Sequence, residues 1–210
     1  MPSTTQILQN LAQIANAQRP AAILWHIALF VLVVALALGF RPRLHQARVA
    51  LAAPIASVSV FAWSYANPFN GAVFGAFAAV LAILGTRAPS ELRVARGPLL
   101  PSAAGVLMIA SGWVYPHFVE VDRWWHFLYE APLGLLPCPT LSVLIGLALL
   151  GGGLGSSAWA SAVSLLGLFY GVFGAWYLGV SADWVLCAGS AFLAFEALRL
   201  NRRNESRADR

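Results

Sequence analysis

The run AAILWHIALFVLVVALALGF, residues 21–40, contains no charged residue and lies between Arg19 and Arg41. A helix needs about 20 apolar residues to cross roughly 30 Å of hydrocarbon, where no backbone group can be left unpaired. The run therefore predicts a transmembrane helix over residues 20–40. The whole chain agrees, because 60% of its 210 residues are hydrophobic and 10% are charged. This composition excludes a water-soluble enzyme, a secreted disulfide scaffold and a nucleic-acid-binding protein.

Turn signals divide the other apolar stretches into six more spans. These stretches are the uncharged runs 49–86, 98–118 and 131–182, and residues 185–199, which contain Glu196 and Arg199 near their end. Asn67-Pro68-Phe69-Asn70 divides the first of them into a hairpin of two spans, and a glycine-rich run at residues 151–157 divides the third. The sequence therefore predicts an all-α fold, an integral membrane bundle of seven transmembrane helices.

The basic residues predict how this bundle is oriented. All thirteen are arginine, and eleven of them follow the first, third or seventh predicted span. Short cytoplasmic loops are enriched in positive charge, so we expect the N-terminus outside and the C-terminus in the cytoplasm. Seven of the eight tryptophans lie near the opposite ends of the spans, as in an aromatic belt, and Trp159 is the exception. The lipid bilayer, rather than nucleic acid, is the expected partner of this positively charged chain.

Three regions are expected along the chain. Residues 1–19 form an amphipathic interfacial segment on the outer surface, because Leu11 and Ile14 continue a helical repeat of apolar residues. Residues 20–199 form a single transmembrane helical domain. Residues 200–210 form a basic cytoplasmic tail that is expected to be disordered.

Few features inside the predicted spans suggest chemistry. His26 is the one imidazole in the first span, and we expect it to be neutral and hydrogen-bonded to another helix. Gly71 and Gly75, like Gly167 and Gly171, are four residues apart, which lets helices approach closely. This spacing predicts packing inside the bundle, with homodimerisation as the alternative.

Polar side chains gather instead in residues 115–140, YPHFVEVDRWWHFLYEAPLGLLPCPT, on the predicted outer side. His126 and Glu130 are four residues apart, and His117 and Glu120 are three apart. Any helical turn would place each imidazole beside a carboxylate. Such pairs suit a transition-metal site or general acid–base chemistry. A solvated loop of mixed charge is the alternative interpretation.

Cys138 lies between two prolines. Proline is tolerated at the first position of a helix, so we expect the fifth span to begin at Pro139 with Cys138 as its N-cap. The helix dipole would favour a thiolate there, which could react or bind a metal together with His126 and Glu130. Alternatively, the Pro-Cys-Pro turn is structural and the cysteine only fills space.

Cys187 lies at nearly the same expected depth as Cys138. The two cysteines could form a disulfide, share a metal, or be two unrelated thiols, and the sequence leaves these alternatives open. Asp183 precedes the seventh span, and we expect it to cap that helix.

This loop resembles the motif of an uncharacterised family of bacterial membrane proteins, domain of unknown function 6064. The similarity lies in the spacing of His126, Tyr129, Pro132 and Gly134, followed by Pro137-Cys138-Pro139-Thr140. The resemblance implies a compact helical bundle that crosses a bacterial cytoplasmic (inner) membrane several times, and it implies no established activity. The family pattern continues with threonines and an aromatic residue, whereas this chain has Leu141-Ser142-Val143-Leu144.

The leading hypothesis is a membrane protein that binds a small ligand or metal ion in an outward-facing pocket, or assists transport. The candidate ligand-binding residues are Cys138, His126, Glu130, Tyr129, His117, Glu120, Trp124 and Trp125. One alternative is a structural subunit of a larger membrane complex. Another is an enzyme acting on lipid or quinone, with His126 and Glu130 as acid and base. The sequence contains no phosphate loop or nucleophile elbow, so binding is favoured over catalysis, and no cofactor is assigned.

Overall fold

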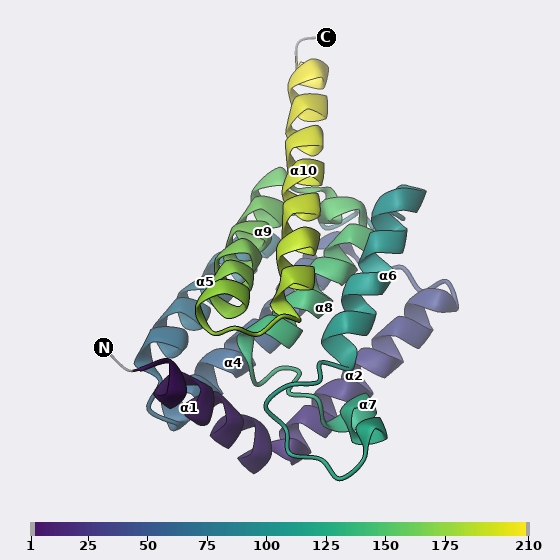
Figure 1. Cartoon of the computed structure of the whole chain (residues 1–210). Helices are drawn as coiled ribbons and strands as arrows, with labels where there is room; N and C mark the ends of the chain where they lie inside the picture. Colours follow the sequence, from purple (N-terminus) through teal and green to yellow (C-terminus); the bar gives the residue numbers. More distant parts are fainter. Residues whose placement is uncertain (1–2, 209–210) are drawn as a thin grey trace.

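A computed structural model describes residues 3–208 of the chain, and for residues 204, 207 and 208 the backbone alone. This part of the protein is helical and has no β-strand, which confirms the predicted all-α class. Figure 1 shows the helices gathered into one bundle. The α-helices are α1 (Thr4–Ala17), α2 (Arg19–Ala37), α3 (Leu44–Ala50), α4 (Ala52–Ser64), α5 (Pro68–Thr86), α6 (Leu99–Trp113), α7 (Phe127–Glu130), α8 (Pro137–Leu150), α9 (Ser157–Val172) and α10 (Asp183–Ala208). Shorter turns are the 3₁₀ segments η1 (Trp124–His126) and η2 (Gly152–Gly155) and the π-helix η3 (Phe173–Tyr177).

Four helical stretches in the part of the chain that the structure describes are long and apolar enough to cross a membrane. They are Arg19–Ala37, Leu44–Ser64, Pro68–Thr86 and Ser157–Tyr177. Helices α6 and α8 are apolar but have 15 and 14 residues, and α10 has 26 residues with a polar C-terminal part. Each of the seven predicted spans thus coincides with a helix, and four of them have the length and composition of a span.

Helix α8 lies in the middle of the bundle (Figure 1). Nearly all its residues are buried, against α6 on one side and α9 and α10 on the other. A helix of 14 residues is about 21 Å long, and neighbouring protein rather than solvent surrounds it. Gly105 of α6 and Gly146 of α8 let the two backbones touch, because a Cβ on either would lie 2.6 Å from the carbonyl oxygen of the other.

The glycine spacing singled out in the sequence serves packing inside this bundle. Gly71 faces the indole of Trp63, so α4 and α5 pack closely. Gly171 faces Cys187, and α9 and α10 pack closely in the same way. These glycines are therefore used within one chain.

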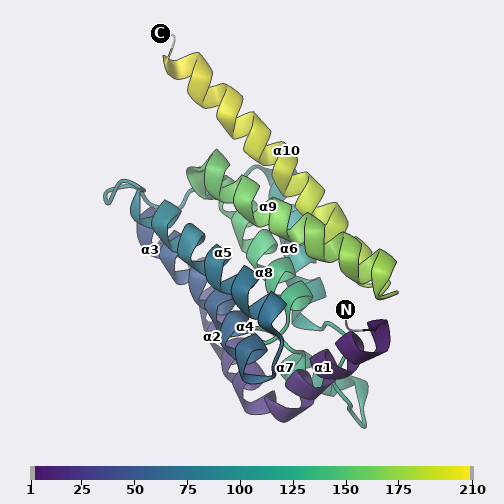
Figure 2. The ribbon, with the colours of Figure 1, turned by 90° about the vertical axis from the view of Figure 1, so that its left-hand side faces the viewer.

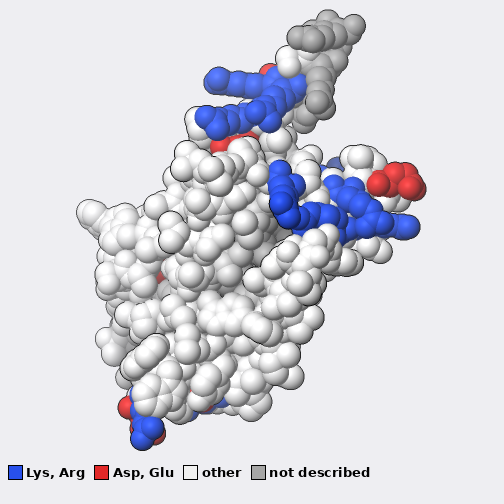
Figure 3. Space-filling view, turned by 90° about the vertical axis from the view of Figure 1, so that its right-hand side faces the viewer, with Lys and Arg blue, Asp and Glu red and all other residues white. Residues whose placement is uncertain are grey.

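The chain connections at one end of the bundle are tied together and rich in arginine. Leu44 N–H donates to Leu92 O (2.7 Å), and Val94 N–H donates to Pro42 O (3.0 Å). The buried side chain of Arg48 donates twice to Leu154 O, at 3.0 and 2.6 Å. Figure 3 shows arginines gathered at this end, a smaller charged group at the opposite end, and an uncharged band between them. We call these the arginine end and the polar end.

Helix α10 connects the two ends. It begins at Asp183, beside Cys138, and its arginines start at Arg199, about 24 Å further along the axis. The Pro-Cys-Pro turn and the C-terminal arginines therefore lie at opposite ends of the bundle. Helix α10 continues past the bundle to Ala208 (Figure 2), so residues 200–208 are helical where the sequence predicted a disordered tail; residues 209–210 lie outside the described chain.

Burial explains the positions of the N-terminal segment and of Trp159. The N-terminal segment forms the expected amphipathic helix, opened by a capping box between Ser3 and Gln6. Its apolar face packs on the protein itself, because Leu11 and Ile14 are buried against the loop that precedes α8. Trp159, the one tryptophan outside the predicted aromatic belt, is fully buried in the core.

Candidate functional site

The polar end is built by the connection between α6 and α8, with α1 lying against it. Asn16 of α1 fixes this connection, since its side chain donates to Phe118 O (2.9 Å) and accepts from Glu120 N–H (2.9 Å). His26 of α2 contacts Trp113 O at 3.0 Å, which confirms its expected hydrogen bond to another helix. These contacts hold the polar connection against α1, α2 and α6.

Glu130 is buried between two basic partners. Its Oε1 lies 3.3 Å from His126 Nδ1, so the predicted pair forms on one helical turn. Its Oε2 lies 3.3 Å from Arg19 NH1, and Arg19 also donates to Glu120 O (2.6 Å) and Asn16 Oδ1 (2.8 Å). The sequence had used Arg19 only as the boundary of a span. Because both oxygens of Glu130 are engaged, this network ties the start of α2 to the connection.

A second cluster joins a phenol, a thiol and a carboxylate. The hydroxyl of Tyr115 donates to Asp183 Oδ1 (2.7 Å), and the thiol of Cys138 donates to Asp183 Oδ2 (3.2 Å). Asp183 is 1% exposed. Burial raises the pKa of the Tyr115 phenol well above its usual range, and the charge of Asp183 and the hydrogen bond to it add to this, so the phenol remains a donor.

The start of α8 differs from the prediction. Leu136 is the N-cap and Pro137 the first residue, so Cys138 is the second residue of the helix rather than its cap. Proline is favoured at the first position of a helix, and both Pro137 and Pro139 satisfy this rule. The sequence alone therefore could not decide which of the two begins α8. Asp183 also differs from the expected helix cap, because its carboxylate accepts from Tyr115 and Cys138 on other elements.

Gly174 makes room for the Asp183 carboxylate. A Cβ at Gly174 would overlap Asp183 Oδ2. Gly174 belongs to the π-helix Phe173–Tyr177, and Val180 N–H donates to its carbonyl (2.9 Å). The widened turn at the end of α9 thus accommodates the buried acid at the start of α10.

The predicted metal ligands do not form one set. Cys138 bonds Asp183, whereas His126 and Glu130 belong to the Arg19 network. Across residues 3–208, no group of three or more histidine, cysteine, aspartate or glutamate side chains could hold a metal ion. Cys138 and Cys187 are free thiols, so the disulfide alternative is not realised in the structure.

The other predicted ligand residues are scattered over the surface of the polar end. His117 Nδ1 contacts Pro116 O of its own turn (2.9 Å), and the ring of Tyr129 lies beside that of His126. Trp124 and Trp125 are both exposed. Trp124 lines an open hollow of about 800 Å³, and Trp125 does not. Of the eight predicted residues, Glu120 and Trp124 line this hollow, together with Val119, Val121, Asp122, Arg123, Phe127 and Arg19.

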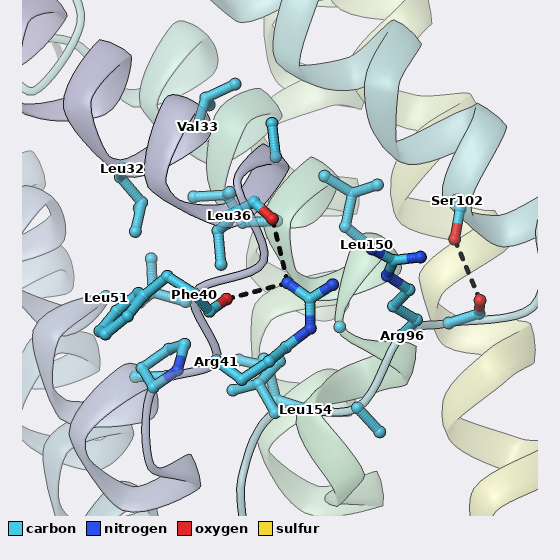
Figure 4. Close-up of a pocket in the computed structure, with 18 of the residues that line it drawn as sticks. Leu32, Val33, Leu36, Phe40, Arg41, Leu51, Arg96, Ser102, Leu150 and Leu154 are labelled. Carbon is cyan, nitrogen blue, oxygen red and sulfur yellow. Dashed lines mark hydrogen bonds between the residues drawn. The ribbon is translucent and has the colours of Figure 1, made fainter.

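An apolar cavity lies at the arginine end, where the sequence predicted no site. Its volume is about 860 Å³, and Figure 4 shows it between α2 and α6 with α8 behind. The lining comes from the C-terminal part of α2, residues 40–42, α3, residues 94–97, the start of α6 and residues 147–154. The side chains are almost all apolar, and Arg41 and Arg96 are the charged residues in the lining. From the sequence, both arginines were expected only to mark the cytoplasmic side of the membrane.

Comparison of the chain with family models, with curated proteins and with solved structures finds no match.

Proposed function

We propose that the chain is a multi-pass membrane protein that binds an amphipathic small molecule taken from the bilayer. The observation that carries this proposal is the apolar cavity of about 860 Å³ between α2, α6 and α8, which we call the α2–α6 cleft. Pockets that bind small molecules typically have volumes of about 300–1,000 Å³, and they are lined mostly by apolar side chains with a few polar groups. The proposal keeps the predicted class of function and moves the site to the other end of the bundle.

The packing of α2 explains why a cleft exists. Helices α2 and α6 run in opposite directions and touch at His26 and Trp113, whose rings lie 5.3 Å apart edge to face. The cleft lies toward the other ends of both helices, beside Leu36 and Leu99. No helix within residues 3–208 fills the space between α2 and α6 at these ends. Helix α8 forms the floor of the cleft.

Apolar side chains on both helices support entry from the bilayer. On α2, Phe30 and Val31 are exposed, and on α6, Leu99 and Leu107 are exposed. Exposed apolar side chains on neighbouring helices are favourable in contact with lipid and unfavourable in contact with water. The proposed setting is the cytoplasmic membrane, with the arginine end in the cytoplasm as the distribution of arginine favours.

The polar end supports a structural role better than catalysis. Glu130 is bonded to Arg19 and His126, and Asp183 to Tyr115 and Cys138. A general base needs a lone pair directed at a substrate. The binding proposal therefore includes no catalytic step and no cofactor.

The test fills the cleft with a bulky side chain. Ala50 lines the cleft and is exposed, so Ala50→Trp should occupy the space without removing a core residue. We expect the purified variant to retain at least tenfold less of a fluorescent long-chain lipid after detergent washing. The matched control is Ala53→Trp, because Ala53 is also exposed and lies outside the cleft. If Ala50→Trp and the natural protein retained equal amounts of the fluorescent lipid, the result would contradict the proposal.

A further inference from the structure

We infer that the ligand of the α2–α6 cleft is an anionic phospholipid whose phosphate binds Arg41 and Arg96, an inference that rests on the proposed function. The cleft has two parts of different chemistry. Its floor and walls are hydrocarbon, including Leu32, Leu36 and Leu150, and its charged groups are the two guanidinium groups. An amphipath with acyl chains and an anionic head group matches both parts.

The two guanidinium groups reach the same opening from different segments. Arg41 follows α2, and Arg96 precedes α6 (Figure 4). The NH1 of Arg41 donates to Leu36 O (3.0 Å) and Phe40 O (2.8 Å). Its side chain is thereby held over the end of α2, and the remaining N–H groups of the guanidinium can donate to a ligand. Guanidinium groups bind phosphate through two parallel hydrogen bonds, which gives strength and direction.

The segments that carry these arginines are fixed to each other before any ligand binds. Arg93 NH1 donates to Arg41 O (2.7 Å), and Val94 N–H donates to Pro42 O (3.0 Å). Gly97 N–H donates to Leu150 O (2.8 Å), which attaches the same segment to the floor of the cleft. A site built this way loses little conformational entropy when it binds.

The charge at the opening is not neutralised by the protein. Among the ion pairs within residues 3–208, none includes Arg41 or Arg96. The N-terminus of α6 also points to this end, and its N-cap Pro98 provides no capping side chain. The positive end of that helix dipole adds to the attraction for an anion. A head group without net negative charge fits this opening less well, because the cationic group of a zwitterionic lipid would be repelled by the two guanidinium groups.

The test compares lipids that differ only in the head group. Delipidated protein in a neutral detergent is titrated with phosphatidylglycerol and with phosphatidylcholine of identical chains, and bound lipid is counted by native mass spectrometry. Both lipids offer a phosphate, but phosphatidylcholine also carries a choline cation that the two guanidinium groups repel. We therefore expect phosphatidylglycerol to bind about tenfold more tightly. Equal affinity for the two lipids would overturn the inference.

Variants assign the preference to the two arginines. The double variant Arg41→Gln/Arg96→Gln should bind phosphatidylglycerol only as well as phosphatidylcholine. Because Arg41 also holds the end of α2, the single variant Arg96→Gln is measured beside it, and a loss of at least threefold is expected. The matched control is Arg87→Gln/Arg202→Gln, two exposed arginines outside the cleft. An equal loss in this control would show general surface attraction and overturn the assignment.

The remaining arms separate the possible failures. Glycerol phosphate without acyl chains should bind at least a hundredfold more weakly than phosphatidylglycerol, and equal binding would overturn the choice of a phospholipid. If Ala50→Trp abolishes lipid binding but the arginine variants keep the head-group preference, the head-group inference fails and the cleft stands. If Ala50→Trp leaves the binding of both lipids unchanged, the proposed function itself fails.

Discussion

Asp183 is the residue on which the buried polar cluster depends. Its carboxylate receives one hydrogen bond from the loop after α6, through Tyr115, and one from the start of α8, through Cys138. A buried carboxylate is costly unless it is hydrogen-bonded, and a donor left without an acceptor is costly too. One side chain thus joins three segments that are distant in the sequence.

Removing this carboxylate should destabilise the fold strongly. Asp183→Ala leaves two buried donors without an acceptor, which costs about 1–3 kcal/mol for each. We expect a lowered midpoint of thermal unfolding in detergent. Asp122→Ala removes an exposed acid from the same end and should change stability by less than about 0.5 kcal/mol. Similar losses in the two variants would contradict the role of Asp183.

Residue identity alone was a partial guide to this cluster. The sequence singled out Cys138 and Asp183 separately, because each lies at the expected start of a helix. It assigned Cys138 to a metal set with His126 and Glu130, since all three lie on one loop. Spacing along a loop does not determine which side chains meet, and the partner of Cys138 lies 45 positions away.

At the scale of elements, α6 and α8 show how small residues determine packing. Gly105 and Gly146 face each other across the helix interface, and neither was singled out in the sequence because they lie on different helices. Glycine pairs that are four apart on one helix can be found by inspection, whereas a pair across an interface requires the fold. The helices themselves were predictable from gaps between charges, while the start of α8 and the extension of α10 were not.

This interface should tolerate no added side chain on α8. Gly146→Ala would place a Cβ 2.6 Å from the carbonyl oxygen of Gly105, so the helices must separate, at a cost of about 1–3 kcal/mol. Gly75→Ala is the comparison, because the nearest atom there is the side-chain hydroxyl oxygen of Ser59, at 3.0 Å, rather than a backbone carbonyl oxygen. Thermal unfolding of both variants measures the difference. A larger loss for Gly75→Ala would contradict this account.

For the whole molecule, the separation of charge makes the proposed orientation testable. Ser90 is exposed at the arginine end, and Asp122 is exposed at the polar end. In intact cells, a membrane-impermeant maleimide should label Asp122→Cys, whereas Ser90→Cys should react only after the membrane is opened. Parent protein with Cys138→Ala and Cys187→Ala provides the background. The reverse pattern of labelling would place the arginine end outside and contradict the proposed topology.

The burial of α8 also affects how the bundle would meet membranes of different thickness. A helix in contact with lipid must match the hydrocarbon layer, and each ångström of mismatch carries a modest energetic cost. Helix α8 is enclosed by its neighbours, so its short length carries no such cost. In the proposed setting, α2 and α5 would set the apolar height of the protein, and tilting them would adjust it while the central helix and its contacts stay unchanged.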